Sequence, residues 1–305
     1  MKKPKVIVIG GPTASGKTTL SIELAKRING EIISADSMQI YKDMNIGTAK
    51  PDEKEKEGIM HYMMDFLPPD KRYSVAEYKK DAKKAIQEVI DKGKVPIVVG
   101  GTGLYIDSLI YEIEFREVET DLKYRQKLEK IVEEKGLEEL YNEAMKIDEE
   151  SMQKISNTDK KRILRVLEIY YETGTKKSQL DKESRKEPEY DYKMFAINMS
   201  RDILYDRINK RVDIMIEKGL IKEVENICKK YNEFPTAMQG LGYKEVVEYL
   251  NKKITREEMI EKIKLESRHY AKRQLTWFRK NKETIWLDGL NNVQNNLKVI
   301  LEELV

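Results

Sequence analysis

The sequence predicts an α/β protein, with a parallel sheet flanked by helices and an all-helical domain inserted into it. Three runs rich in β-branched residues, Lys5–Ile9, Glu31–Ala35 and Val95–Val99, have the length of buried strands. Helix-compatible sequence lies between them over Lys17–Arg27 and Val75–Asp91. Strands that alternate with helices form parallel sheets covered on both faces, and ligands bind such sheets beyond the carboxyl ends of the strands.

The middle of the chain changes to charged, helix-forming sequence with few β-branched runs. We therefore expect a helical insertion domain over residues 117–190. It would separate a first part of the core, residues 1–116, from a second part, residues 191–305.

The second part of the core contains a candidate returning strand at Met194–Asn198. Apolar residues at helical spacing over Ile203–Leu220 predict one long amphipathic helix, and another is expected over Arg256–Phe278. Ile285–Leu287 is a candidate for a last short strand.

The composition is typical of an ordered protein, since 40% of the 305 residues are apolar and can build a core beside 36% charged residues. Cys228 is the only cysteine and His61 and His269 are the only histidines, which excludes a disulfide framework and argues against a Cys/His zinc site. We expect a cytoplasmic protein without a membrane anchor or signal peptide. The net charge of +3 is too small to predict nucleic-acid binding by itself.

A glycine loop lies between the first strand and the first helix. Gly11–Thr18 matches the P-loop pattern G-x-x-x-x-G-K-[ST] in the context that the pattern requires. Loop N–H groups, the helix dipole and Lys17 can face phosphate oxygens, while Thr18 can ligate Mg²⁺. The loop predicts polyphosphate binding in a P-loop NTPase-like core, but not nucleotide hydrolysis. The predicted binding residues are Gly11, Pro12, Thr13, Ala14, Ser15, Gly16, Lys17 and Thr18.

Asp36 follows the second strand, so we expect it at the carboxyl edge of the sheet near the P-loop. An aspartate there can ligate a metal, accept a proton or cap a following helix, and these three roles stay open. The third strand ends in Gly100 and Gly101, without the metal-holding acid of many P-loop NTPases. Glycines permit close approach of a substrate, and Thr102 can donate or accept a hydrogen bond.

Four motifs follow one another along the chain: Gly11–Thr18, Asp36–Tyr41, Gly47–Pro51 and Gly100–Tyr105. In order and spacing they resemble the bacterial tRNA dimethylallyltransferases, the IPP transferase family. The resemblance covers nearly the whole chain, through Asp159, Arg162, Arg165, Leu167–Glu168, Arg207–Gly219, Met238–Glu245 and Arg273–Arg279.

Two short segments depart from the family pattern. His61–Tyr62 stands where the family has a His-His pair, and Gly174–Lys177 replaces a Gly-Lys-Pro turn. These changes affect local loops, and His61 is expected to be packed or hydrogen-bonded.

The resemblance implies transfer of a dimethylallyl group from dimethylallyl diphosphate to N6 of the adenosine at tRNA position 37, 3′ of the anticodon, with Mg²⁺ as cofactor. The amine of adenine is a poor nucleophile because its lone pair is delocalised into the ring, and the family assigns the general base to the residue that matches Asp36. The leaving diphosphate develops negative charge, which cations and loop N–H groups can stabilise. The implied catalytic residues are Asp36, Lys17, Thr18, Thr102 and Arg211, with Thr18 as metal ligand.

Thr13 and Arg211 match family positions that contact the diphosphate. Taken without the resemblance, a solvated charge on a helix is the favoured interpretation of Arg211, since most surface arginines face solvent.

A basic segment, Arg268–Lys282, carries six Lys or Arg residues and no Asp or Glu, with Tyr270, Trp277 and Phe278 among them. This pattern suits phosphate contacts and base stacking, although the same aromatic residues could form the core face of a helix. A second basic cluster, Lys160–Arg165, lies on the insertion, which we expect to bind the anticodon stem-loop. The expected tRNA-binding residues are Asp36, Ser37, Met38, Gln39, Thr102, Lys161, Arg162, Ile163, Leu164, Arg165, Gln239, Gly240, Arg273, Trp277 and Arg279.

Three other functions fit parts of this pattern: a P-loop kinase of a small metabolite, an adenylate isopentenyltransferase acting on free nucleotides, and a non-catalytic RNA-binding NTPase switch. The missing acid after Val99 and the basic segment argue against the kinase. The long C-terminal half would have no evident use in an enzyme of free nucleotides. We expect a monomer that binds tRNA and dimethylallyl diphosphate and no membrane.

Overall fold

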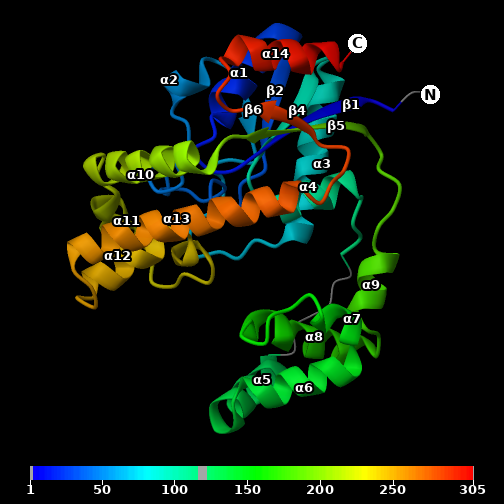
Figure 1. The fold of residues 1–305 in the computed structure, drawn as a ribbon, viewed down its shortest axis with the longest axis vertical. Coiled ribbons are helices and arrows are strands. Elements are labelled where there is room, and N and C mark those ends of the chain that lie inside the picture. Colours follow the sequence, from blue (N-terminus) through cyan, green and yellow to red (C-terminus); the bar gives the residue numbers. More distant parts are fainter. Residues whose placement is uncertain (1–2, 116–121, 305) are drawn as a thin grey trace. The chain divides into compact units, whose positions relative to one another are not determined.

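The computed structural model describes residues 3–115 and 122–304, and the chain divides into two compact units (Figure 1). Unit 1 consists of Met1–Ile110 with Pro188–Val305, and unit 2 of Tyr111–Glu187. The sequence placed the corresponding boundaries at residues 116/117, which lie outside the described residues, and at 190/191. No helix in the described ranges is long and apolar enough to cross a membrane.

Unit 1 is built on a six-stranded sheet in the order β3-β2-β4-β1-β5-β6, and every neighbouring pair is parallel. This confirms the predicted α/β fold with a parallel sheet. The centre of the sheet is occupied by β1, with β4 on one side and β5 on the other. The strands are β1 (Lys5–Gly10), β2 (Gly30–Ser34), β3 (His61–Tyr62), β4 (Val95–Gly100), β5 (Asp191–Asn198) and β6 (Ile285–Asp288).

The predicted strands exist with shifted ends. β5 begins at Asp191, three residues before the predicted start, because its polar first residues still pair with β1, where Asp191 lies opposite Lys5. The short strand β3 was not predicted. Its two residues pair with Ile32 and Ile33, and a run of two residues has no periodicity to read.

Helices cover both faces of the sheet. α1 and α14 pack together on one face, and α3 and α4 pack together on the other (Figure 1). The unit 1 helices are α1 (Lys17–Ile28), α2 (Glu53–Lys56), α3 (Val75–Asp91), α4 (Gly103–Ile110), α10 (Arg201–Glu217), α11 (Leu220–Lys230), the 3₁₀ helix η1 (Ala237–Gln239), α12 (Tyr243–Leu250), α13 (Arg256–Phe278) and α14 (Val293–Glu302).

The bounds predicted for α3 and α13 are confirmed. Both helices start at capping boxes: Ser74 and Glu77 bond each other's backbone N–H groups before α3, and Thr255 and Glu258 do so before α13.

The long amphipathic helix predicted over Ile203–Leu220 exists as α10, but its predicted end is wrong. α10 ends at Glu217, Gly219 has a φ of 98°, and Leu220 begins α11. A left-handed φ ends a helix, but the apolar spacing continues across the break and therefore hides it.

Hydrophobic clusters of buried residues stabilise unit 1, and two of them hold the C-terminal helices. One joins the sheet to α1, α10 and α14 through residues such as Leu24 and Phe195. The other joins the segment after β2 to α11, α12 and α13, with Tyr41 and Tyr243 completely buried. The second cluster therefore fixes the chain that follows β2 against the C-terminal helices.

Unit 2 contains helices only among its described residues, around a core that includes Leu128, Leu140, Ile163 and Leu164. Its buried Asp148 accepts the backbone N–H groups of Ser151 at 3.2 Å and Ser178 at 2.8 Å, which ties two short helices together. The helices are α5 (Leu122–Lys135), α6 (Leu137–Ile147), α7 (Glu149–Met152), α8 (Lys160–Thr173) and α9 (Lys177–Glu183).

We expect Gly10→Ala to destabilise the protein. A Cβ at Gly10 would lie 2.6–3.0 Å from ring carbons of Phe278, whose side chain is completely buried and has no room to move. Overpacking of this kind costs about 1–3 kcal/mol of unfolding free energy. Chemical denaturation measures it, and the double variant with Phe278→Leu should recover part of the loss. If the losses of unfolding free energy in the two single variants simply added up in the double variant, this explanation by packing would be contradicted.

Candidate active site

The carboxyl ends of β1, β2 and β4 bring three loops to one edge of the sheet. The P-loop follows β1, Asp36 follows β2, and Thr102 follows β4. Neighbouring loops are bonded directly, since the N–H group of Thr102 donates to the carbonyl of Ala35 at 3.1 Å. A substituent on Gly100 would collide with that carbonyl, at 2.1 Å, so a glycine is required for this close approach.

The P-loop wraps tightly around the start of α1. Gly11 and Gly16 have φ values of 142° and 92°, which favour glycine, and Ala14 adopts 61°. The ammonium of Lys17 donates to the carbonyl of Pro12 at 2.7 Å. The Ser15 hydroxyl is buried without a hydrogen-bond partner among the described residues, so it can serve a ligand.

Two cations of unit 1 repel each other at this loop. The pKa of Lys17 is lowered to about 7, chiefly by burial and also by repulsion from Arg211, while attraction by Asp36 partly opposes both effects. Burial also lowers the pKa of the Arg211 guanidinium, again opposed by Asp36. Arg211 is therefore no solvated helix charge, and the cluster is suited to an anionic ligand.

The two carboxylate oxygens of Asp36 differ in their surroundings. Oδ1 accepts the backbone N–H groups of Met38 at 2.9 Å and Gln39 at 3.3 Å, which stabilises a turn; no helix follows directly, so the expected role as a helix cap is wrong. No hydrogen bond to Oδ2 is found within the described part of the chain, which leaves this oxygen available to accept a proton. Stabilising this turn and accepting a proton are thus compatible in one residue.

Thr102 connects the site to α13. Its Oγ1 accepts the backbone N–H group of Ser37 at 3.0 Å. The hydroxyl of Tyr270, on α13, bonds the side chains of Thr102 and Gln274, while burial and the charge of Asp36 raise the pKa of Tyr270 to about 12. Tyr270 is therefore a neutral hydrogen-bonding group at neutral pH.

Gln274 clamps two of the loops together. Its Oε1 accepts the N–H group of Thr13 at 2.9 Å, and its Nε2 donates to the carbonyl of Gly101 at 3.0 Å. Our sequence reasoning missed Gln274 and treated Tyr270 only as a possible stacking residue. The sequence did contain a signal for this pair: a glutamine four residues after a tyrosine on a long amphipathic helix lies on the same face of that helix.

The family model for IPP transferase matches residues 39–281, most of the chain. The chain belongs to this family. Two similar relatives, both tRNA dimethylallyltransferases, come from Acetivibrio thermocellus (52% identical, 97% of each chain covered) and Caldanaerobacter subterraneus subsp. tengcongensis (50%, with 90% of this chain and 89% of the relative covered). The predicted family and transferase class are confirmed.

Solved structures agree. The tRNA delta(2)-isopentenylpyrophosphate transferase from Staphylococcus epidermidis is 44% identical, with a TM-score of 0.73 and 99% of each chain covered. A eukaryotic dimethylallyltransferase acting on tRNA is 32% identical, with a TM-score of 0.82 over 99% of this chain and 79% of that one. The IPP transferase fold is therefore shared over the full length.

Three of the candidate RNA-contacting residues of unit 1 lie at the C-terminal end of α13. On α13, Arg273 and Arg279 are exposed, while Trp277 is half-buried and donates from its indole to Asp107 at 2.9 Å. A Cβ on Gly103 would lie 2.3 Å from the Trp277 ring, so this ring also packs on α4. Much of the surface of the Trp277 side chain therefore contacts other residues of the protein.

The segment around η1 approaches the loop after β2. A Cβ on Gly240 would lie 2.8 Å from the sulfur of Met38, so these two predicted RNA-binding positions are neighbours. Gln239 is exposed beside them.

The candidates in unit 2 separate into two groups. Lys161 and Arg162 are exposed, and Arg165 pairs with the buried Glu168 at 3.4 Å. Ile163 and Leu164 are completely buried in the helical core, so the expectation that their side chains bind RNA is wrong. They were included because they lie between basic residues, but on a helix they face inward.

Lys17 provides a pH test of the anion site. Its pKa of about 7 means that the free protein loses this proton above pH 7, so binding of an anion takes a proton up. We expect affinity for an alkyl diphosphate to be full below pH 7 and to weaken roughly tenfold per pH unit between pH 7.5 and 9, measured by calorimetry. An arginine does not titrate in this pH range, so the affinity of Lys17→Arg should depend on pH only through the titration of the ligand itself. Equal slopes for both proteins would contradict the assignment.

Proposed function

We propose that this protein transfers the dimethylallyl group of dimethylallyl diphosphate to N6 of the adenosine at position 37 of tRNA. The observation that carries the proposal is the grouping of one carboxylate with two half-buried cations, Asp36 with Lys17 and Arg211, at the loop edge of the sheet. The relatives named tRNA dimethylallyltransferase support the choice of substrates.

The diphosphate is held by the P-loop. Lys17 and Arg211 repel each other in the free protein, and an anion between them removes that repulsion. As the allylic C–O bond breaks, negative charge grows on the diphosphate, and these fixed cations stabilise it without reorganising. The N–H group of Thr13 is already bonded to Gln274, so Thr13 contributes to binding through its side chain.

Mg²⁺ fits this site with Thr18 as its ligand. The described residues contain no group of three His, Cys, Asp or Glu side chains that could hold a metal, and Thr18 is exposed at the start of α1. Mg²⁺ commonly keeps several waters and binds through few protein groups and substrate phosphates, which suits a single hydroxyl. Bound there, the ion would neutralise diphosphate charge.

Asp36 acts as the general base. Its Oδ2 takes the N6 proton as the N–C bond forms, while Oδ1 keeps the loop in place through Met38 and Gln39. The target adenosine must leave its stack in the anticodon loop to reach this oxygen. Ser37, Met38 and Gln39 line its path together with Thr102 and the segment of Gln239 and Gly240.

The tRNA backbone is bound by the exposed cations of α13 and of unit 2. Arg273 and Arg279 supply the first group, and Lys161, Arg162 and Arg165 the second. The protein is expected to act as a monomer in the cytoplasm. Incubation with dimethylallyl diphosphate, Mg²⁺ and unmodified tRNA, followed by mass analysis of the nucleosides, tests the function; an unmodified position 37 would refute it.

We expect Asp36→Asn to lower kcat by roughly 10²- to 10⁴-fold, the usual effect of losing a positioned base. An asparagine oxygen can still accept the two backbone N–H groups, so the loop and the affinity for tRNA should be kept. Single-turnover rates and both substrate affinities measure this. Asp181→Asn, the same substitution at an exposed ion pair with Lys177 in unit 2, is the matched control and should keep the normal rate.

If Asp36 instead ligated the metal, diphosphate binding would weaken and excess Mg²⁺ would partly restore the rate. A normal rate for Asp36→Asn at every Mg²⁺ concentration would leave stabilisation of the turn as its only role.

We expect Arg279→Ala with Lys280→Ala to weaken tRNA binding and to flatten its salt dependence by roughly one unit of slope per lost phosphate contact. Filter binding over a salt series measures this slope. Lys229→Ala with Lys298→Ala removes two exposed cations elsewhere on unit 1 and is the control. An unchanged slope for the first pair would reject their contact with phosphates.

A further inference from the structure

We propose that Glu223 on α11 is a positioning residue for the reaction, which acts on Asp36 through the loop that follows β2. The proposal rests on the proposed function, in which Asp36 accepts the proton. Glu223 lies far along the sequence from Asp36, and the resemblance to the family attached no role to it.

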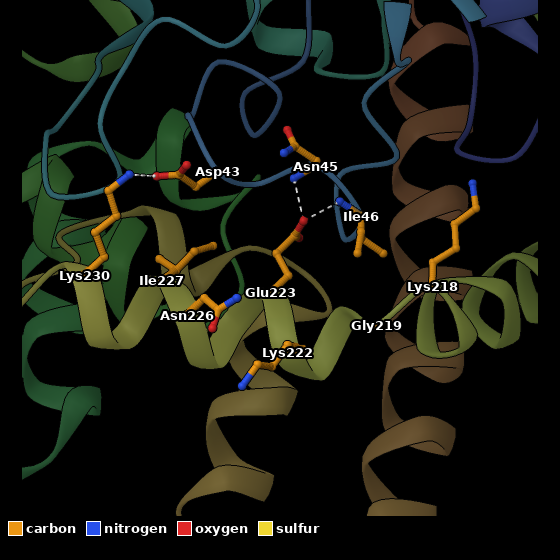
Figure 2. A pocket seen from close by; sticks show the side chains of 10 residues that line it. All are labelled: Asp43, Asn45, Ile46, Lys218, Gly219, Lys222, Glu223, Asn226, Ile227 and Lys230. Carbon is orange, nitrogen blue, oxygen red and sulfur yellow. Dashed lines mark hydrogen bonds and ion pairs between the residues drawn. The ribbon is translucent and has the colours of Figure 1, made fainter. Parts of the chain in front are cut away.

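The carboxylate of Glu223 receives four hydrogen bonds, and the two to Asn45 and Ile46 are visible in Figure 2. Oε2 accepts the backbone N–H groups of Asn45 at 2.9 Å and Ile46 at 2.7 Å. Oε1 accepts the N–H group of Gly47 at 3.2 Å and the hydroxyl of Tyr243 at 2.6 Å. Hydrogen bonds to an ionised acceptor are about twice as strong as neutral ones, so this carboxylate holds three consecutive amides.

The held segment also borders open space. A pocket of about 540 Å³ lies beside it (Figure 2). Its lining includes Asn45 and Ile46 of the segment and Glu223 and Asn226 of α11. The hydrogen bonds of Glu223 therefore hold the segment at the wall of an open pocket.

Hydrogen bonds continue from this segment to the base. The N–H group of Ala49 donates to the carbonyl of Ile46 at 3.0 Å, which closes a turn. The side-chain amide of Gln39 donates to the carbonyls of Thr48 at 3.2 Å and Ala49 at 3.5 Å. The backbone N–H group of Gln39 in turn donates to Oδ1 of Asp36. A shift of the turn therefore moves the residue that orients the catalytic carboxylate.

Tyr243 fixes the other side of the same turn. Its ring is completely buried, and a Cβ on Gly47 would lie 2.5 Å from it. Burial and the neighbouring carboxylate raise the pKa of its hydroxyl, so it stays a donor to Glu223. The carboxylate is thereby aimed at the loop and not at solvent.

Glu223→Gln is the sharpest variant. A glutamine has the same shape, but its NH₂ group faces at least one backbone N–H donor at either oxygen position, so the turn is pushed away. A displacement of about 1 Å at a reacting group can cost 10²-fold in rate. We expect the single-turnover rate to fall roughly 10- to 100-fold, while the KM for dimethylallyl diphosphate stays within about twofold and the amplitude stays normal.

The variants Asp36→Asn, Glu223→Gln and their combination are measured together, with Lys222→Gln on the same helix as control. If Glu223 acts through Asp36, the double variant is no slower than Asp36→Asn alone. Tyr243→Phe, which keeps the three amide bonds, should lose less than about fivefold. Should Glu223→Gln not fold, Glu223→Asp replaces it, with the same expectation of a slower rate and a normal amplitude.

Other results overturn the inference. A normal rate for Glu223→Gln, a loss of amplitude without a loss of rate, or a double variant whose losses multiply would each show that Glu223 does not act through the base. A normal rate for Asp36→Asn would instead refute the base itself, so the two failures are distinguishable.

Discussion

Repulsion between two half-buried cations governs this site. Lys17 lies on the P-loop and Arg211 on α10, so two distant segments of the chain must be held near each other at an electrostatic cost. The attraction of Asp36 offsets only part of that cost. The rest is offset by packing, chiefly the hydrophobic cluster that joins α10 to the sheet. Part of the free energy of folding thus offsets the repulsion between Lys17 and Arg211, and a bound anion removes this repulsion.

The parallel sheet makes such an arrangement possible, because all its strands end at the same edge. The side chains at this edge come from loops, and other parts of the chain must hold these loops in place. Two polar side chains on C-terminal helices hold these loops: Gln274 on α13 bonds two loops, and Glu223 on α11 bonds a third. The C-terminal half of the IPP transferase core therefore positions the loops of the candidate site.

Sequence reasoning succeeded where one pattern dominated. The glycine loop, the strands before it and after it, and helices α3 and α13 follow from periodicity and caps that are local in sequence. It failed at the break between α10 and α11, because Gly219 interrupts a helix without interrupting its apolar spacing. It also placed Ile163 and Leu164 in the RNA site, since neighbouring cations outweighed their apolar character.

The groups that fix the loops were missed for a different reason. Glu223 accepts hydrogen bonds from backbone N–H groups. Almost every residue type has such a group, so the sequence does not show which residues bond to Glu223. Gln274 likewise bonds one backbone N–H and one carbonyl. A glutamate or glutamine on an amphipathic helix is normally a solvated residue, so only coordinates separate these two from the many others in this charged chain.

The order of the sheet also bears on how the protein is made. Its central strand, β1, is synthesised first, but its partner β5 begins only at Asp191, after all of unit 2 has left the ribosome. Unit 2 is continuous in sequence and has its own core, so it can fold while β1 still lacks a neighbour. Pairing over such a long separation is slow. A nascent chain stalled within unit 2 would therefore expose one edge of β1, with its unpaired backbone groups, to chaperones.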